Sequence, residues 1–142
     1  MQISARNNWP AIVDNIDKGP VSTEIQLRLD SGDAAVATIT TASANSLSLV
    51  PGVRVRVLVK ASSVMVLAGD GADVGISARN CLSGQVTQVE HGAVQSIVAL
   101  RTTNGTEITA SITKASAEKL GLVAGKPAAA LVKASDVLIL SE

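Results

Sequence analysis

The sequence predicts a mainly β protein made of two tandem small β-barrels, each with one short helix. Two observations support this prediction. The pentapeptide Ile3–Asn7 (ISARN) returns 73 positions later as Ile76–Asn80. In the segments that follow it, apolar residues alternate with polar ones, which is typical of strands with one buried face.

The repeat extends over the whole chain. Residues 1–69 align with residues 74–142 without a gap, and 28 of the 69 aligned pairs are identical. The glycines of the expected turns fall in register, for example Gly52 with Gly125. A repeat of this length marks two copies of one structural unit. We therefore predict a first domain over residues 1–69, a short Gly/Asp joint over residues 70–73 and a second domain over residues 74–142.

Three alternating runs in the first copy predict strands, over Val21–Leu29, Ala34–Thr40 and Val53–Ala61. In the last run, Val53, Val55, Val57 and Val59 share one side, so that side is expected to face a core. Strands around a single short helix, within about 70 residues, are typical of a small barrel of the OB type.

One short helix is expected in each copy, directly after Thr40 and Thr113, with Gly121 as the residue that ends the second helix. A barrel of this size with almost no aromatic residues buries little surface and needs additional packing to be stable. We therefore expect a homo-oligomer. A monomer of two separate barrels is the alternative.

The composition limits the partners that the protein can recruit. Its 12 Lys and Arg balance its 12 Asp and Glu, so no net charge attracts nucleic acid or an anionic membrane. Phe and Tyr are absent and Trp9 is the single aromatic residue. Proteins that bind single-stranded nucleic acid need aromatic side chains on which the bases stack. No apolar run is long enough to cross a bilayer. We expect neither a nucleic-acid partner nor a membrane partner.

The sequence favours a cytoplasmic location. The first residues lack the basic region and apolar run of a signal peptide. Cys81 is the single cysteine and cannot form an internal disulfide, which suits a reducing compartment. We expect Cys81 to be a small buried residue.

A set of polar residues recurs at equivalent positions in the two copies. The set is rich in hydroxyls and cations and holds no carboxylate, so it can donate hydrogen bonds to a ligand whose oxygens only accept them. Small neighbours such as Ala5 and Ala61 would let backbone N–H groups approach that ligand. The members are Ser4, Arg6, Asn7, Thr40, Ser43, Lys60 and Ser62 in the first copy and Ser77, Arg79, Asn80, Thr113, Ser116, Lys133 and Ser135 in the second.

Each part of this set also has a purely structural explanation. Thr40 and Ser43 stand at the start of the predicted helix, where free N–H groups favour an anion, but a hydroxyl there is usually a helix cap. Lys60 and Lys133 end a predicted strand, where a lysine often only protects a sheet edge. Because all the parts recur at one offset, we favour an oxyanion site.

The motifs ISARN at the start of each copy, IT-x-x-S in its middle and VKAS-x-V at its end resemble those of the molbindins, small molybdate-binding proteins of the Mop (TOBE) type. The resemblance covers essentially the whole chain, twice, as in a tandem two-domain molbindin. It implies OB-like Mop domains, a cytoplasmic homotrimer, and binding of molybdate or tungstate between domains of neighbouring subunits. It implies no organic cofactor and no direct cation ligands.

The resemblance also assigns site residues. One side of a site would comprise Ser4, Ala5, Arg6, Lys60, Ala61 and Ser62, completed by Thr40 and Ser43 of a facing unit, and the second copy would contribute Ser77, Ala78, Arg79, Lys133, Ala134 and Ser135 with Thr113 and Ser116. The side chains of Arg6 and Arg79 could instead brace the site without touching the ligand. Asp136 stands where the first copy has Ser63, and a carboxylate beside an anion weakens binding unless it points away.

We therefore expect an oxyanion-binding protein that acts in storage and homeostasis of molybdate or tungstate. Cavity size would set selectivity over sulfate, because both ligands are tetrahedral dianions. The alternative is an oligomeric OB-type interaction scaffold without a small-molecule ligand. An enzyme is not expected, because the single histidine, His91, lies in a predicted turn and no nucleophile–base pair or metal-ligand cluster is visible.

Overall fold

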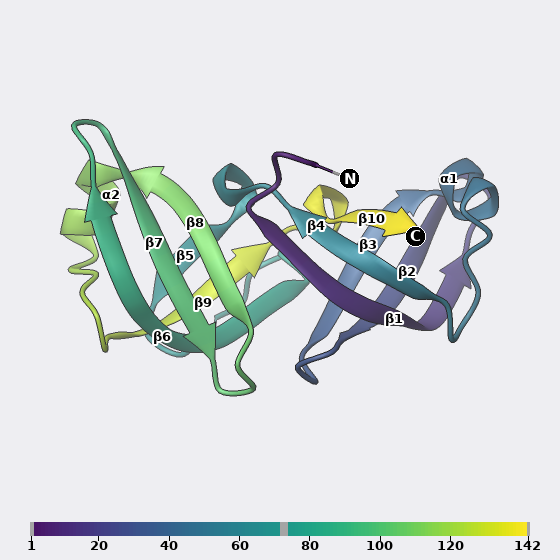
Figure 1. The fold of residues 1–142 in the computed structure, drawn as a ribbon, viewed down its shortest axis with the longest axis horizontal. Helices are drawn as coiled ribbons and strands as arrows, with labels where there is room; N and C mark the ends of the chain where they lie inside the picture. Colours follow the sequence, from purple (N-terminus) through teal and green to yellow (C-terminus); the bar gives the residue numbers. More distant parts are fainter. Residues whose placement is uncertain (1, 72–73, 142) are drawn as a thin grey trace.

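A computed structural model describes residues 2–71 and 74–141 and contains two five-stranded antiparallel sheets that lie side by side (Figure 1). The first repeat contributes β1 (Asn7–Lys18), β2 (Ser22–Leu29), β3 (Ala34–Thr40), α1 (Thr41–Ser46), β4 (Arg54–Val59), the 3₁₀ turn η1 (Ala61–Ser63) and β5 (Met65–Ala68). The second contributes β6 (Asn80–His91), β7 (Gln95–Thr102), β8 (Glu107–Thr113), α2 (Lys114–Lys119), β9 (Pro127–Val132), η2 (Ala134–Asp136) and β10 (Leu138–Ser141).

The two repeats exchange their last strands. The strand order is β10-β4-β1-β2-β3 in one sheet and β5-β9-β6-β7-β8 in the other. Strand β10 pairs with β4 from Leu138↔Leu58 to Ser141↔Val55, and β5 pairs with β9 in the same way. The edge strands of each sheet then meet, β10 with β3 and β5 with β8, so each sheet curls into a small barrel.

The predicted fold class is confirmed: the chain is mainly β, with two curled sheets and one short helix in each repeat. The sequence did not predict the strand exchange, through which each sheet takes one strand from the other repeat. Two residues of the predicted joint, Ala72 and Asp73, lie outside the described residues.

The alternating runs also missed β1 and β6, the long first strand of each repeat. In β1 the register shifts between Val13 and Asn15, so a bulge at Asp14 interrupts the two-residue period. In β6 the shift falls between Val86 and Gln88. A bulge moves later side chains to the opposite face, and therefore the alternation that predicts a strand is lost.

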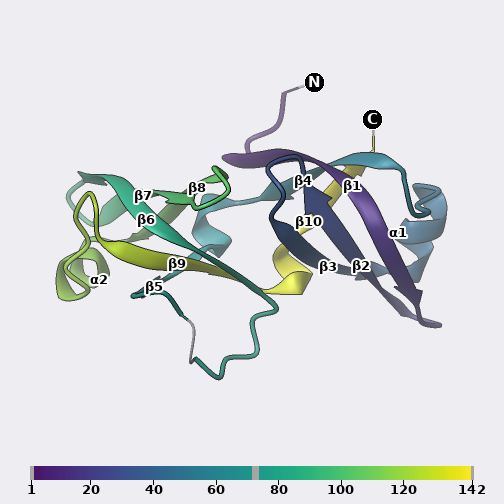
Figure 2. The same cartoon turned by 90° about the horizontal axis from the view of Figure 1, so that it is seen from below.

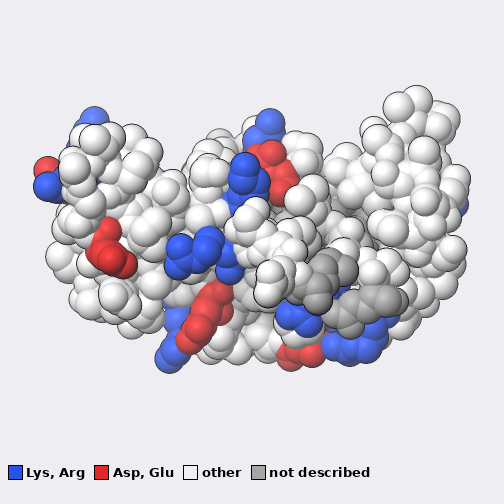
Figure 3. All heavy atoms as spheres, turned by 45° about the horizontal axis from the view of Figure 1, so that its top comes forward, with Lys and Arg blue, Asp and Glu red and all other residues white. Residues whose placement is uncertain are grey.

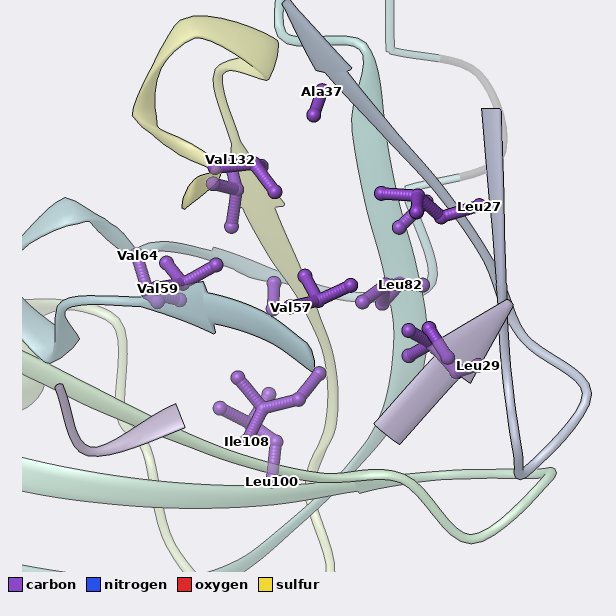
Figure 4. Close-up of a cluster of buried hydrophobic side chains, with 14 of the residues drawn as sticks. Leu27, Leu29, Ala37, Val57, Val59, Val64, Leu82, Leu100, Ile108 and Val132 are labelled. Carbon is purple, nitrogen blue, oxygen red and sulfur yellow. The ribbon is translucent and has the colours of Figure 1, made fainter. Parts of the chain in front are cut away.

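The buried side chains of the two barrels form one hydrophobic cluster. Figure 4 shows Val57 and Leu29 of the first sheet near Leu82, Leu100 and Ile108 of the second. All five are at most 9% exposed. Burying a side chain of this size stabilises a fold by about 1.5–3 kcal/mol. The core therefore extends across the junction between the barrels and holds the two repeats together.

Both predicted helices are present and begin at the predicted residues. Thr40 is the N-cap of α1 and Thr113 that of α2. Gly121 follows α2 with φ +63°, and its N–H donates to Glu118 O, so it ends the helix as expected. The equivalent residue after α1 is Ser48, which has φ +54° and is the one non-glycine with positive φ among the described residues.

We predict that Ser48→Gly raises the free energy of unfolding by about 0.5–1 kcal/mol, because glycine adopts the left-handed conformation without the steric cost that a Cβ brings. The gain is partly offset by the larger entropy of glycine in the unfolded chain. Urea denaturation measures the change in the free energy of unfolding. The reciprocal change Gly121→Ser serves as a control and should destabilise by a similar amount; equal stabilities for all three proteins would contradict the argument.

One expectation about the fold is wrong. Cys81 is exposed, not buried, because it lies on the outward face of β6, where its neighbours Asn80 and Leu82 turn inward. Among the described residues, no helix has both the length and the apolar character needed to cross a membrane.

Candidate functional site

The sheet brings two predicted segments together at one end of β1. Asn7, the first residue of β1, pairs with Val59, the last residue of β4. The segments Ser4–Arg6 and Lys60–Ser62 therefore leave the sheet side by side. We call these six residues strand-end cluster 1. Its hydroxyl and charged side chains are exposed, as a site that meets a ligand or a second subunit requires.

The second repeat builds the same arrangement. Asn80 pairs with Val132, so Ser77–Arg79 and Lys133–Ser135 leave the second sheet together and form strand-end cluster 2. Ala78 and Ala134 are buried, whereas the hydroxyls and cations around them are exposed. Strand residues 52 positions apart in the sequence thus pair, and the segments beyond them meet as the predicted site requires.

The hydroxyl pairs at the helix starts lie elsewhere. Thr40 Oγ1 accepts a hydrogen bond from Ser43 N at 3.1 Å and donates to Ser43 Oγ at 2.8 Å. Thr113 and Ser116 repeat this geometry at 3.0 and 2.8 Å. Each threonine thus caps its helix, so the structural explanation of these hydroxyls holds.

Within one chain, the helix starts do not approach the strand-end clusters. Figures 1 and 2 agree that α1 and α2 lie at the two outer ends of the molecule, whereas η1 and η2, which belong to the clusters' turns, lie near its middle. The two groups of predicted site residues are therefore not brought together within one chain.

Two buried asparagines join the barrels. Asn7 Nδ2 donates to Thr109 O at 2.8 Å, and Thr109 N donates to Asn7 Oδ1 at 2.7 Å. Asn80 makes the equivalent pair with Val36, at 2.8 and 2.7 Å. In each case the side-chain amide takes the place of a neighbouring strand: it forms hydrogen bonds with a backbone N–H and a backbone C=O at the edge of the opposite sheet. Their recurrence in the sequence therefore reflects the junction between the barrels.

We predict that Asn7→Ala and Asn80→Ala each lower the free energy of unfolding by about 2–4 kcal/mol, because each leaves a backbone N–H and C=O of the facing strand without a partner. Asn7 and Asn80 are only 2% and 5% exposed, so water cannot easily replace the amide. Thermal and urea unfolding measure the loss. Asn8→Ala, at an exposed neighbour, should change stability by no more than about 0.5 kcal/mol; a loss as large as that at Asn7 would contradict a specific role.

Arg79 is committed to a partner across the junction. Its Nη1 and Nη2 lie 3.0 and 3.1 Å from the two carboxylate oxygens of Glu24 in β2. The hydrogen bond from Arg79 lowers the pKa of Glu24 below its ordinary value. The side chain of Arg79 therefore braces the two barrels. The residue equivalent to Glu24 is Ile97, so Arg6 lacks this partner.

A polar network surrounds Asp33, in the turn between β2 and β3. Its carboxylate accepts hydrogen bonds from Thr102 Oγ1 at 2.6 Å, Asn104 Nδ2 at 2.8 Å and Thr106 Oγ1 at 2.5 Å, all from the second barrel. Burial by itself would raise the pKa of Asp33, but these hydrogen bonds together lower it below its ordinary value of 3.8. The charged form is therefore the one that holds the two barrels together.

This network predicts an acid dependence of stability. Because the pKa of Asp33 is lower in the folded state, its contribution is fully present above pH 3.8 and is lost as the pH falls through the folded-state pKa. We expect Asp33→Asn to cost about 1–2 kcal/mol at pH 7 and less near pH 2. Urea unfolding at both pH values measures it, and a cost that does not change with pH would refute this assignment.

A hollow of about 460 Å³ lies along the junction on the side of Trp9. The indole Nε1 of Trp9 donates to Glu107 O at 2.9 Å, which adds a contact between β1 and β8. Arg6 lines this hollow. In the view of Figure 3, charged side chains of both signs lie mainly over the middle of the molecule, while the α1 end carries almost none.

Sequence reasoning named the two strand-end clusters and noted that Asn7 and Asn80 recur, but it did not predict that residues of this kind join the barrels. Asn7 and Asn80 recur in both copies, and that signal could have identified them as structural. Glu24 and Asp33 have no carboxylate at the equivalent positions of the second repeat, so no repeated pattern marks them.

Comparison with known proteins supports this description of two repeats. The model of the TOBE domain matches residues 3–66 and 76–139. The chain is 40% identical over 139 residues to a molybdenum transport protein ModE of Herbaspirillum seropedicae, and 43% identical over 139 residues to the molybdenum-pterin-binding protein MopA of Rhodobacter capsulatus. These alignments cover 98% of this chain but only 51% and 52% of those proteins, so the chain spans about half the length of these two relatives.

A solved structure resembles the whole chain. The cytoplasmic molybdate-binding protein ModG, crystallised with molybdate bound, superposes with a TM-score of 0.95 at 40% identity, and the match covers 100% of both chains. The resemblance inferred from the ISARN and VKAS motifs is confirmed. Because the family model matches both repeats over most of their length, the chain belongs to the TOBE domain family and carries two copies of that domain in tandem.

Proposed function

We propose that this protein binds molybdate or tungstate reversibly in the cytoplasm and acts in storage and homeostasis of the oxyanion. The full-length similarity to ModG, whose crystals held molybdate, carries the proposal. The strand-end clusters support it, because each gathers hydroxyls, a lysine and an arginine within one short stretch of the surface. Such a donor set suits a bare tetrahedral dianion. No covalent step and no organic cofactor is part of the proposal.

Each proposed site combines a strand-end cluster with a helix start of a neighbouring subunit. The ligand-binding groups would be Ser4, Ala5, Arg6, Lys60, Ala61 and Ser62 with Thr40 and Ser43, and Ser77, Ala78, Arg79, Lys133, Ala134 and Ser135 with Thr113 and Ser116. The distance between helix starts and clusters within one chain supports this division between subunits. The proposed assembly is a homotrimer.

Exposed apolar residues support an oligomer. Four pairs recur at equivalent positions of the two repeats, and all eight side chains are at least 42% exposed: Ile3 and Ile76, Val21 and Val94, Val50 and Val123, and Met65 and Leu138. Val21 and Val94 are 75% and 71% exposed. Exposed apolar side chains that recur in this way are more consistent with a surface covered by another subunit than with scattered exposure.

Equilibrium dialysis against molybdate, tungstate and sulfate tests the proposal. We expect molybdate and tungstate to be retained far more strongly than sulfate, and to raise the melting temperature because they bind only the folded protein. Retention no better than that of sulfate would refute the proposed function. The alternative, an interaction scaffold without a ligand, instead predicts a melting temperature and oligomer mass that do not respond to any of the three anions.

A further inference from the structure

The two strand-end clusters carry different fixed charges, although their ligand-binding residues are the same. Each holds one lysine and one arginine, Lys60 with Arg6 in cluster 1 and Lys133 with Arg79 in cluster 2. The difference lies in the residues around them. A carboxylate near an anion site lowers its affinity by Coulomb repulsion, even without touching the ligand.

Cluster 2 has two such carboxylates. Glu24 binds Arg79 through two hydrogen bonds, at 3.0 and 3.1 Å, and so cancels the charge of that guanidinium. Asp136 lies in η2, directly after Ser135 and within the turn that carries Ala134. It is exposed and belongs to the same short segment as the proposed ligands. One lysine and one arginine are thus matched by two acids.

Cluster 1 lacks both acids. Ile97 occupies the position equivalent to Glu24, and Ser63 occupies that of Asp136. Arg6 instead lines the hollow beside Trp9.

Two acidic residues also line that hollow, and each already has a partner. Asp30 accepts two hydrogen bonds of 2.8 Å from Arg54, and Glu107 pairs with Arg101 at 2.5 Å. Both are therefore neutralised by arginines that do not belong to either cluster. The positive charge of Arg6 and Lys60 remains uncompensated by an acid of the cluster's own turns.

We propose that the two repeats of this chain form oxyanion sites of unequal affinity, with the stronger site at cluster 1, and that Glu24 and Asp136 set the difference. This inference rests on the proposed function. Glu24 acts by neutralising the charge of Arg79, and Asp136 acts through its own charge. The protein would then fill its cluster 1 sites at low oxyanion concentration and its cluster 2 sites only at higher concentration, which widens the range over which it buffers.

The expected difference in dissociation constant is about tenfold at moderate salt. Two carboxylates close to a dianion in a partly solvated site have an effect of this order, and salt screens it. The difference should shrink when the ionic strength is raised from low to high, because the charges act through solvent and not by contact.

Isothermal titration with molybdate on single-site variants tests the inference. Lys133→Ala retains cluster 1 and Lys60→Ala retains cluster 2, so we expect the first variant to bind about tenfold more tightly than the second. In the Lys60→Ala background, the double change Glu24→Gln and Asp136→Ser should raise the affinity for molybdate by most of this tenfold difference. Introducing Ser63→Asp in the Lys133→Ala background should weaken binding.

Asp14→Asn is the matched control, since it removes a carboxylate from an exposed ion pair with Arg28 in the same barrel as Glu24. It should leave both affinities within about twofold, because it lies outside the clusters. Equal affinities for Lys60→Ala and Lys133→Ala, or no gain from Glu24→Gln with Asp136→Ser in a protein that keeps its melting temperature, would overturn the inference and leave the proposed function standing. Failure of the unaltered protein to bind molybdate would refute the proposed function, and the inference with it.

Discussion

Replacing Lys60 and Lys133 together by alanine should weaken molybdate binding at least about 100-fold while the protein stays folded. Each lysine is the one ammonium of its cluster and lies exposed at the end of a strand, between β4 or β9 and the following 3₁₀ turn. Its charge-assisted hydrogen bonds are expected to stabilise the bound dianion directly. Neither side chain caps its turn, so its removal breaks no structural contact of that kind.

Equilibrium dialysis measures the loss, and circular dichroism with thermal unfolding checks the fold. The control is Arg28→Ala, which removes a positive charge from an exposed ion pair with Asp14, outside both the clusters and the helix starts. It should keep binding within about threefold, because distant surface charges are screened. If the control loses as much affinity as the test variant, the clusters are not the site and overall charge dominates.

Residues 1–69 alone should fail to fold as a monomer and should form a dimer instead. In the full chain β4 is covered on one side by β10, which comes from the second repeat. The isolated half lacks β10, and its own β5 has no β9 to pair with. Two copies can satisfy each other, because β5 of each can occupy the place of β10 beside the partner's β4. A dimer of this kind has a melting temperature that rises with protein concentration.

Sedimentation equilibrium and melting curves at several concentrations test this expectation. A shorter half that ends at residue 63 removes β5 and is the matched control. It should stay unfolded at every concentration, because it leaves the edge of β4 open in all copies. A cooperative melt of the 1–69 half as a monomer would show that the strand exchange is not needed for folding.

The exchange also explains why a barrel of this size is stable in one chain. Neither repeat holds a complete sheet, so neither is expected to fold alone as a monomer. The asparagine pairs at Thr109 and Val36, the network at Asp33 and the shared core all act across the same junction. The two repeats are therefore expected to unfold in one transition.

The sequence by itself determined the local structure and the content of the clusters. In the strands that end at Leu29, Thr40 and Val59, apolar and polar residues alternate with a period of two. That period indicates which face of each strand is buried. Thr40 and Gly121 mark helix ends through interactions with their own neighbouring backbone. The clusters could be found because a duplicated chain preserves them at one offset.

Only the tertiary structure decided which strand pairs with which, and what joins the barrels. The sequence of β10 is the same whether β10 pairs with β4 or with β9, so it does not identify the partner strand. Glu24 and Arg79 are 55 residues apart, and no repeated signal links them. The exposure of Cys81 likewise depended on the register of a strand whose bulge hides its period. Local sequence periodicity specifies the orientation of a side chain relative to its own strand, whereas the choice of partner depends on contacts between residues far apart in the chain.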